Sequence, residues 1–71
     1  MTKYEMLTHI NIAIKWAMEN DEKILEAIKC KMIHNGFSFR GWGYKANKRM
    51  LRLNKEELAG LMSEIVECMY S

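Results

Sequence analysis

The sequence predicts an all-α protein: a small bundle of three to four short helices in a single helical domain over residues 1–71. Three observations indicate this fold. The chain has 71 residues, 49% of them hydrophobic, which is enough for one modest core. It contains no proline, which helices tolerate and turn-rich β-proteins rarely do without. Its apolar residues recur every three or four positions, as in amphipathic helices.

The first helix is predicted to begin at Lys3, because Thr2 and Glu5 have the spacing of a capping box. At about 100° per residue, an apolar stripe forms along the segment that follows. Its members are Leu7, Ile10, Ile14, Ala17 and Met18, bordered by Met6 and Ala13. Ile12 and Trp16 lie well outside this stripe, so the helix has a second apolar side that faces either a bundle or another molecule.

A second helix is predicted after Asn20-Asp21-Glu22, which offers an N-cap and acidic residues for a first turn. Its inner face comprises Ile24, Leu25, Ile28 and Met32. The helix should end at His34-Asn35-Gly36, where glycine suits the position after the C-cap. Because the two stripes keep nearly the same phase, one unbroken helix from Lys3 to His34 is the alternative, and we favour the break.

Glycines predict a loop over residues 36–43, in which Phe37 and Phe39 alternate as in a short extended piece. Residues 44–53 predict a short third helix with one wholly basic face. Its apolar half comprises Tyr44, Ala46, Met50, Leu51 and Leu53, and its basic half Lys45, Lys48, Arg49 and Arg52.

A fourth helix should follow Asn54, which suits an N-cap, with Glu57 at the third helical position. Its inner stripe comprises Leu58, Leu61, Met62, Ile65 and Met69. Its outer face carries Glu56, Glu57, Glu64 and Glu67. This anionic face argues against a helix-turn-helix protein, because the DNA major groove would repel it. Gly60 lies inside this helix at a cost of about 1 kcal/mol relative to alanine, and either allows a close helix contact or has no role.

Basic and acidic residues are concentrated in different segments of the chain, a separation that its formal net charge of +2 does not reveal. Between Ala27 and Arg52 there are seven basic side chains and no acidic one, and four of the seven aromatic residues lie in the same segment. Basic groups neutralise phosphates or acidic protein surfaces, and aromatic rings stack on bases. The predicted binding face comprises Arg40, Trp42, Tyr44, Lys45, Lys48, Arg49 and Arg52. The alternative is that Phe37, Phe39 and Trp42 are core residues and the lysines are merely solvated.

Three functions suit such a face. The first is a non-enzymatic regulator, an inhibitor or adaptor that docks on an anionic macromolecular surface; size alone favours a phage or other mobile element as its origin. The second is a nucleic-acid-binding protein that contacts single strands or the backbone. The third is an oligomer that sequesters a small anionic nucleotide.

The sequence offers little for catalysis or metal binding, so we expect neither an enzyme nor a cofactor. Ser63 has no glycine-rich elbow, and the histidines have no evident nucleophile partner. Cys30 and His34 are one helical turn apart, but there is no C-x-x-C pair to complete a zinc site.

Tyr4, Ile12 and Trp16 lie beside or outside the main stripe of the first helix, either as a core edge or as an oligomer interface. We expect a homo-oligomer, with a dimer favoured. No apolar run approaches the roughly 18 residues of a membrane span, and the N-terminus lacks a secretion signal. The two cysteines suit free thiols, so a cytoplasmic protein is expected.

Overall fold

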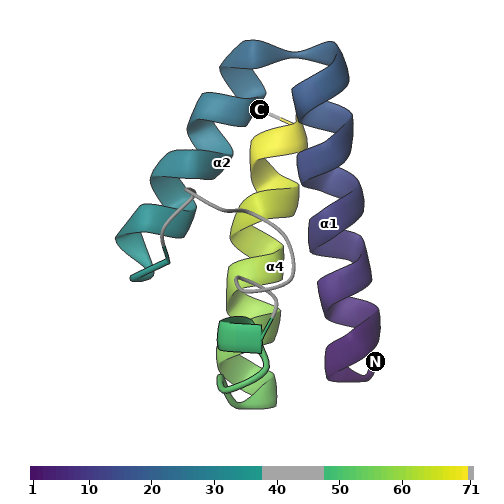
Figure 1. Cartoon of the computed structure of the whole chain (residues 1–71), viewed down its shortest axis with the longest axis vertical. Helices are drawn as coiled ribbons and strands as arrows, with labels where there is room; N and C mark the ends of the chain where they lie inside the picture. Colours follow the sequence, from purple (N-terminus) through teal and green to yellow (C-terminus); the bar gives the residue numbers. More distant parts are fainter. Residues whose placement is uncertain (38–47, 71) are drawn as a thin grey trace.

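The computed structural model describes residues 1–37 and 48–70, whose helices pack as an up-down-up bundle (Figure 1). Helix α1 spans Lys3–Asn20, α2 spans Glu22–His34 and α4 spans Lys55–Tyr70. Each of these helices contacts the other two, and α1 and α4 run in the same direction (Figure 1). Residues 48–50 are also helical, and no strand forms among the described residues. The predicted all-α bundle is confirmed.

Local capping fixes where α1 begins and where α2 starts. The Thr2 hydroxyl accepts from the Glu5 N–H at 3.2 Å, and the Glu5 carboxylate accepts from the Thr2 N–H at 2.9 Å. This is the predicted capping box. Asp21 has extended backbone angles, and its carboxylate accepts from the N–H groups of Lys23 and Ile24. The chain therefore breaks at Asp21, and the alternative of one unbroken helix is wrong.

The capping box makes α1 sensitive to acid. The hydrogen bond from the Thr2 backbone lowers the pKa of the Glu5 carboxyl. Because the folded pKa lies below the unfolded one, this contribution is present above the unfolded value of about 4.3 and is lost as pH falls through the folded value. Urea unfolding between neutral pH and about pH 3 should therefore show a steeper acid loss for the wild type than for Glu5→Gln. Parallel profiles would show that this bond contributes nothing.

Gly36 ends α2 in a Schellman motif. Its φ of +84° lies in the left-handed region. The Gly36 N–H donates to the Ile33 carbonyl and the Phe37 N–H to the Met32 carbonyl, each at 2.9 Å. These are the two hydrogen bonds that define the motif, and they turn the chain so that Phe37 is buried beside α2.

Two glycines with open surroundings give a matched pair of substitutions. An alanine Cβ would meet nothing within 4 Å at either Gly36 or Gly60. Gly36→Ala should lower the free energy of unfolding by about 1–2 kcal/mol, because its φ is unfavourable for an L-residue. Gly60→Ala, inside α4, should instead raise it by up to about 1 kcal/mol through helix propensity. Thermal unfolding of both variants checks the signs, and a stabilised Gly36→Ala would contradict the left-handed cap.

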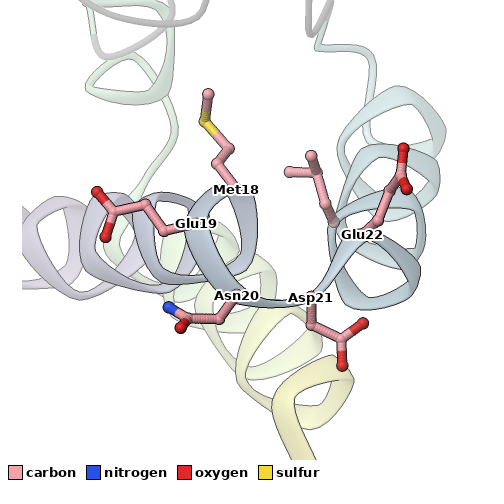
Figure 2. Close-up of a pocket in the computed structure, with 6 residues that line it drawn as sticks. Met18, Glu19, Asn20, Asp21 and Glu22 are labelled. Atoms are coloured by element: carbon pink, nitrogen blue, oxygen red, sulfur yellow. The ribbon is translucent and has the colours of Figure 1, made fainter.

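One core joins all of the helices, and it differs in detail from the predicted stripes. Its buried members are Met6, Leu7, Ile10, Ala13, Ile14, Ala17, Ile28, Met32, Phe37, Met50, Leu58, Leu61, Ile65 and Cys68. Met6 and Ala13, predicted at the border, are buried, whereas Met18 is exposed. Met18 lies in the last turn of α1, where it lines an open hollow at the turn into α2 (Figure 2). On α4, Cys68 is buried, and Met62 and Met69 are only half-buried.

Candidate functional site

The basic segment continues from the helical residues 48–50 into a tight turn. The Arg52 N–H donates to the Arg49 carbonyl at 3.1 Å, and the Leu53 N–H to the Met50 carbonyl at 3.0 Å. These bonds join residues three apart, so the predicted helix over residues 44–53 ends at residue 50, three residues early. In such 3₁₀-type geometry, side chains three apart lie one above the other. Arg49 and Arg52 accordingly share the exposed side, while Met50 is buried and Leu53 half-buried.

Contacts to both neighbouring helices hold this turn in place. Met50 is 0% exposed, and Leu51 and Leu53 pack against the core. The Lys3 ammonium of α1 donates to the Leu51 carbonyl at 3.2 Å. On the other side, the Asn54 side chain accepts from the Glu57 N–H at 2.8 Å, and the Glu57 carboxylate accepts from the Asn54 N–H at 3.2 Å. The second predicted capping box is present, and the exposed arginines stand on a fixed backbone.

Lys48, Arg49 and Arg52 are the predicted binding residues that the structure describes, and all three are exposed. Within residues 1–37 and 48–70, the guanidinium groups of Arg49 and Arg52 form no salt bridge. Four other predicted members, Arg40, Trp42, Tyr44 and Lys45, lie outside the described residues, as does Phe39. Phe37 is a core residue, so the alternative interpretation is correct for this aromatic.

Among the residues that the structure describes, the basic residues of the segment between Ala27 and Arg52 lie on two parts of the bundle. Lys29 pairs with Glu26 of its own helix at 3.2 Å. Lys31 lies near Cys68 of α4; burial raises the pKa of that thiol, and the charge of Lys31 partly offsets this. Lys29 and Lys31 thus belong to the flank of the bundle, whereas residues 48–52 lie at the end where α4 begins (Figure 1).

Within the described ranges, the end of the bundle that carries the arginines is more basic than the remaining part. It includes the first turn of α1, residues 48–53 and the first turn of α4 (Figure 1). Its bases are Lys3, Lys48, Arg49, Arg52 and Lys55, and its acids Glu5, Glu56 and Glu57. The remaining described charges are Glu19, Asp21, Glu22, Glu26, Glu64 and Glu67 against Lys15, Lys23, Lys29 and Lys31. Lys3, whose ammonium donates to the Leu51 carbonyl of the turn, was not among the predicted binding residues. No sequence pattern links it to Leu51.

Tyr4, Ile12 and Trp16 are all exposed on α1, so they do not form a core edge. They belong to one row of residues four apart, which winds by about 40° per step around a helix. Tyr4 and Trp16 therefore lie on different flanks of α1, and the three residues do not form one compact patch. On α4, Val66 is also exposed, about 160° around the helix from Glu64.

A hydrogen bond of Glu64 indicates which way Val66 points, because the two residues lie on nearly opposite flanks of α4. The Asn35 side chain donates to Glu64 at 2.9 Å, so the Glu64 flank of α4 faces the end of α2. Val66 therefore lies on the flank of α4 that points away from the end of α2. Val66 and Tyr70, one turn apart, are both exposed, and neither was predicted from the sequence as an exposed apolar residue. Their four-residue spacing outside the stripe of α4 is the signal that could have found them.

An open hollow of about 350 Å³ lies at the turn between α1 and α2 (Figure 2). Its lining comprises Met18, Glu19, Asn20, Asp21, Glu22 and Leu25. Figure 2 shows the carboxylates of Glu19, Asp21 and Glu22 pointing in different directions. Asp21 already accepts two backbone hydrogen bonds as the cap of α2. Among the described residues, no three His, Cys, Asp or Glu side chains gather as a metal ion would require.

Comparison of the chain with protein-family models, with curated proteins and with solved structures finds no match. No helix in the described ranges combines the length and the apolar character needed to cross a membrane. What the fold and the site define is a small helical bundle that exposes, at one end, a basic turn held by hydrogen bonds and by a buried methionine.

Proposed function

We propose that the protein is a non-enzymatic regulator, an inhibitor or adaptor, that docks on an acidic surface of a partner protein through the turn carrying Lys48, Arg49 and Arg52. One observation supports this most strongly. Two arginines without a salt bridge in the described structure stand on a backbone that a buried methionine, a lysine and a capping box hold in place. Exposed arginines are enriched at the centres of protein interfaces.

Affinity capture from the native host with matched variants tests this function. The immobilised proteins are the wild type, Arg49→Gln/Arg52→Gln, and Lys15→Gln/Lys23→Gln. The second double variant removes the same charge from exposed positions elsewhere on the bundle. A partner should be retained by the wild type and the lysine variant and lost by the arginine variant, because only that variant removes the docking groups. Equal capture by all three proteins would contradict docking through the turn.

The same experiment separates the other two candidate functions. Capture that nuclease abolishes would indicate nucleic acid, whose affinity should then fall log-linearly with salt concentration. A nucleotide held between subunits should raise the melting temperature of the isolated protein. Neither outcome is expected if the ligand is an acidic protein surface. We place this activity in the cytoplasm, since free Cys30 and Cys68 suit a reducing compartment.

We also propose that the protein is a homodimer joined through the outer side of α1, which exposes Ile12 and Trp16. Exposed aromatic and aliphatic side chains are typical of interface centres. Ile12→Lys should reduce the mass measured by sedimentation to that of a monomer. Ile33→Lys is the matched control, because Ile33 on α2 is 62% exposed and Ile12 is 60% exposed. A wild type that is monomeric at all concentrations, or equal effects of both variants, would contradict this interface.

A further inference from the structure

We infer that Arg49 and Arg52 form a paired guanidinium clamp that binds two carboxylates of an acidic peptide segment on the partner. This inference rests on the proposed function and names the chemistry that its basic turn recognises. The two side chains leave the same side of the turn, because their backbones are joined by an i to i+3 hydrogen bond of 3.1 Å.

The spacing of the two arginines fits alternate residues of an extended chain. Three residues of 3₁₀-type backbone rise by about 6 Å. In an extended peptide, residues i and i+2 point to the same side and lie roughly 6.6–6.8 Å apart. Each guanidinium offers a planar fork that can donate two parallel hydrogen bonds to one carboxylate. Two acidic residues separated by one other residue can therefore each meet one arginine.

The backbone beneath the clamp is fixed before any ligand arrives. Met50 is buried between the two arginines in sequence, and Lys3 holds the Leu51 carbonyl. The capping box at Asn54 fixes the chain immediately after the turn. Binding therefore has to order only the arginine side chains, which cost about 0.5–1.5 kcal/mol each.

Neighbouring acids favour a short carboxylate ligand over a nucleic-acid strand. Exposed Glu56 lies in the first turn of α4, four residues after Arg52. Exposed Glu5 lies in the first turn of α1, the helix whose Lys3 donates to the Leu51 carbonyl. A nucleic-acid strand carries a phosphate on every nucleotide, so its charged backbone extends beyond two arginines. Phosphates that come within about one Debye length of Glu5 or Glu56, roughly 8 Å, would be repelled, because salt screens charges weakly at such distances. A peptide with neutral residues around its two carboxylates avoids this repulsion.

Fluorescence anisotropy with the full-length protein tests the clamp. The probe is a labelled octapeptide of glycine and serine with two glutamates at alternate positions, and its control has the two glutamates adjacent. The proteins are the wild type, Arg49→Lys/Arg52→Lys, Arg49→Gln/Arg52→Gln and Lys15→Gln/Lys23→Gln, each checked for helical content by circular dichroism. The wild type should bind the alternating peptide more tightly than the adjacent one, because adjacent residues of an extended chain point to opposite sides.

The variants distinguish this clamp from simple charge attraction. The glutamine pair should lose about tenfold or more in affinity, since charged hydrogen bonds are lost. The lysine pair should lose several-fold, because it keeps the charge without the forks. Wild-type affinity in the arginine-to-lysine variant would overturn the clamp while leaving docking by charge intact. Wild-type affinity in the glutamine pair would overturn both. Tighter binding of a labelled oligothymidylate than of the peptide would also overturn the clamp, because the turn would then select phosphate.

Discussion

Phe37→Ala is expected to lower the free energy of unfolding by about 3–5 kcal/mol, the usual cost of removing a buried phenylalanine. Phe37 is 7% exposed and packs in the core, where it follows the Schellman turn. Its N–H bonds the Met32 carbonyl, so its ring is placed beside the last turn of α2. Small domains of this length have about 4–10 kcal/mol of stability in total, so the variant should be barely folded at room temperature.

Urea unfolding followed by circular dichroism measures this effect. Ile33→Ala is the control on the same part of the chain, because Ile33 is exposed and its loss should change stability by no more than about 0.5 kcal/mol. Phe37→Leu, which fills more of the cavity, should be less destabilised than Phe37→Ala. A loss below about 1 kcal/mol for Phe37→Ala would show that this ring does not support the core.

The helix boundaries that depend on short-range hydrogen bonds could be predicted from the sequence. Thr2 with Glu5, Asn54 with Glu57, and Gly36 each act within a few residues, and each forms the expected cap. The junction at Asp21 is also local, but hydrophobic phase alone does not reveal it, because the apolar stripe is continuous across it. The break occurs at Asp21, whose carboxylate accepts hydrogen bonds from backbone N–H groups in the first turn of α2.

Features that depend on long-range packing could not be predicted. Periodicity gives the direction of a stripe, but which border residue is buried depends on the neighbouring helix, as Ala13 and Met18 show. Leu51 and Leu53 fit a continued helix as well as a turn, and the contact from Lys3, 48 residues away from Leu51, has no local signal. Likewise, a run of basic residues in sequence does not reveal that Lys31 and Arg52 lie on different parts of the bundle.

Met50→Ala should separate the stability of the bundle from the rigidity of the basic turn. Met50 is 0% exposed, and its loss should lower the free energy of unfolding by about 2–5 kcal/mol. It also lies between Arg49 and Arg52, so a cavity beneath it should loosen the turn that presents them. We therefore expect weaker binding of the acidic peptide even by the folded protein, because both arginines must then be ordered at binding.

Ile65→Ala provides the comparison, since Ile65 is equally buried but lies in the second half of α4, away from the turn. Its cavity should cost a similar 2–5 kcal/mol of stability, by the same mechanism. At low temperature, where circular dichroism shows both variants folded, Ile65→Ala should bind the peptide as the wild type does and Met50→Ala several-fold more weakly. Equal binding by the two variants would mean that Lys3 and the Asn54 capping box hold the turn without Met50. The rigidity of the arginine pair would then come from hydrogen bonds at its two ends and not from packing beneath it.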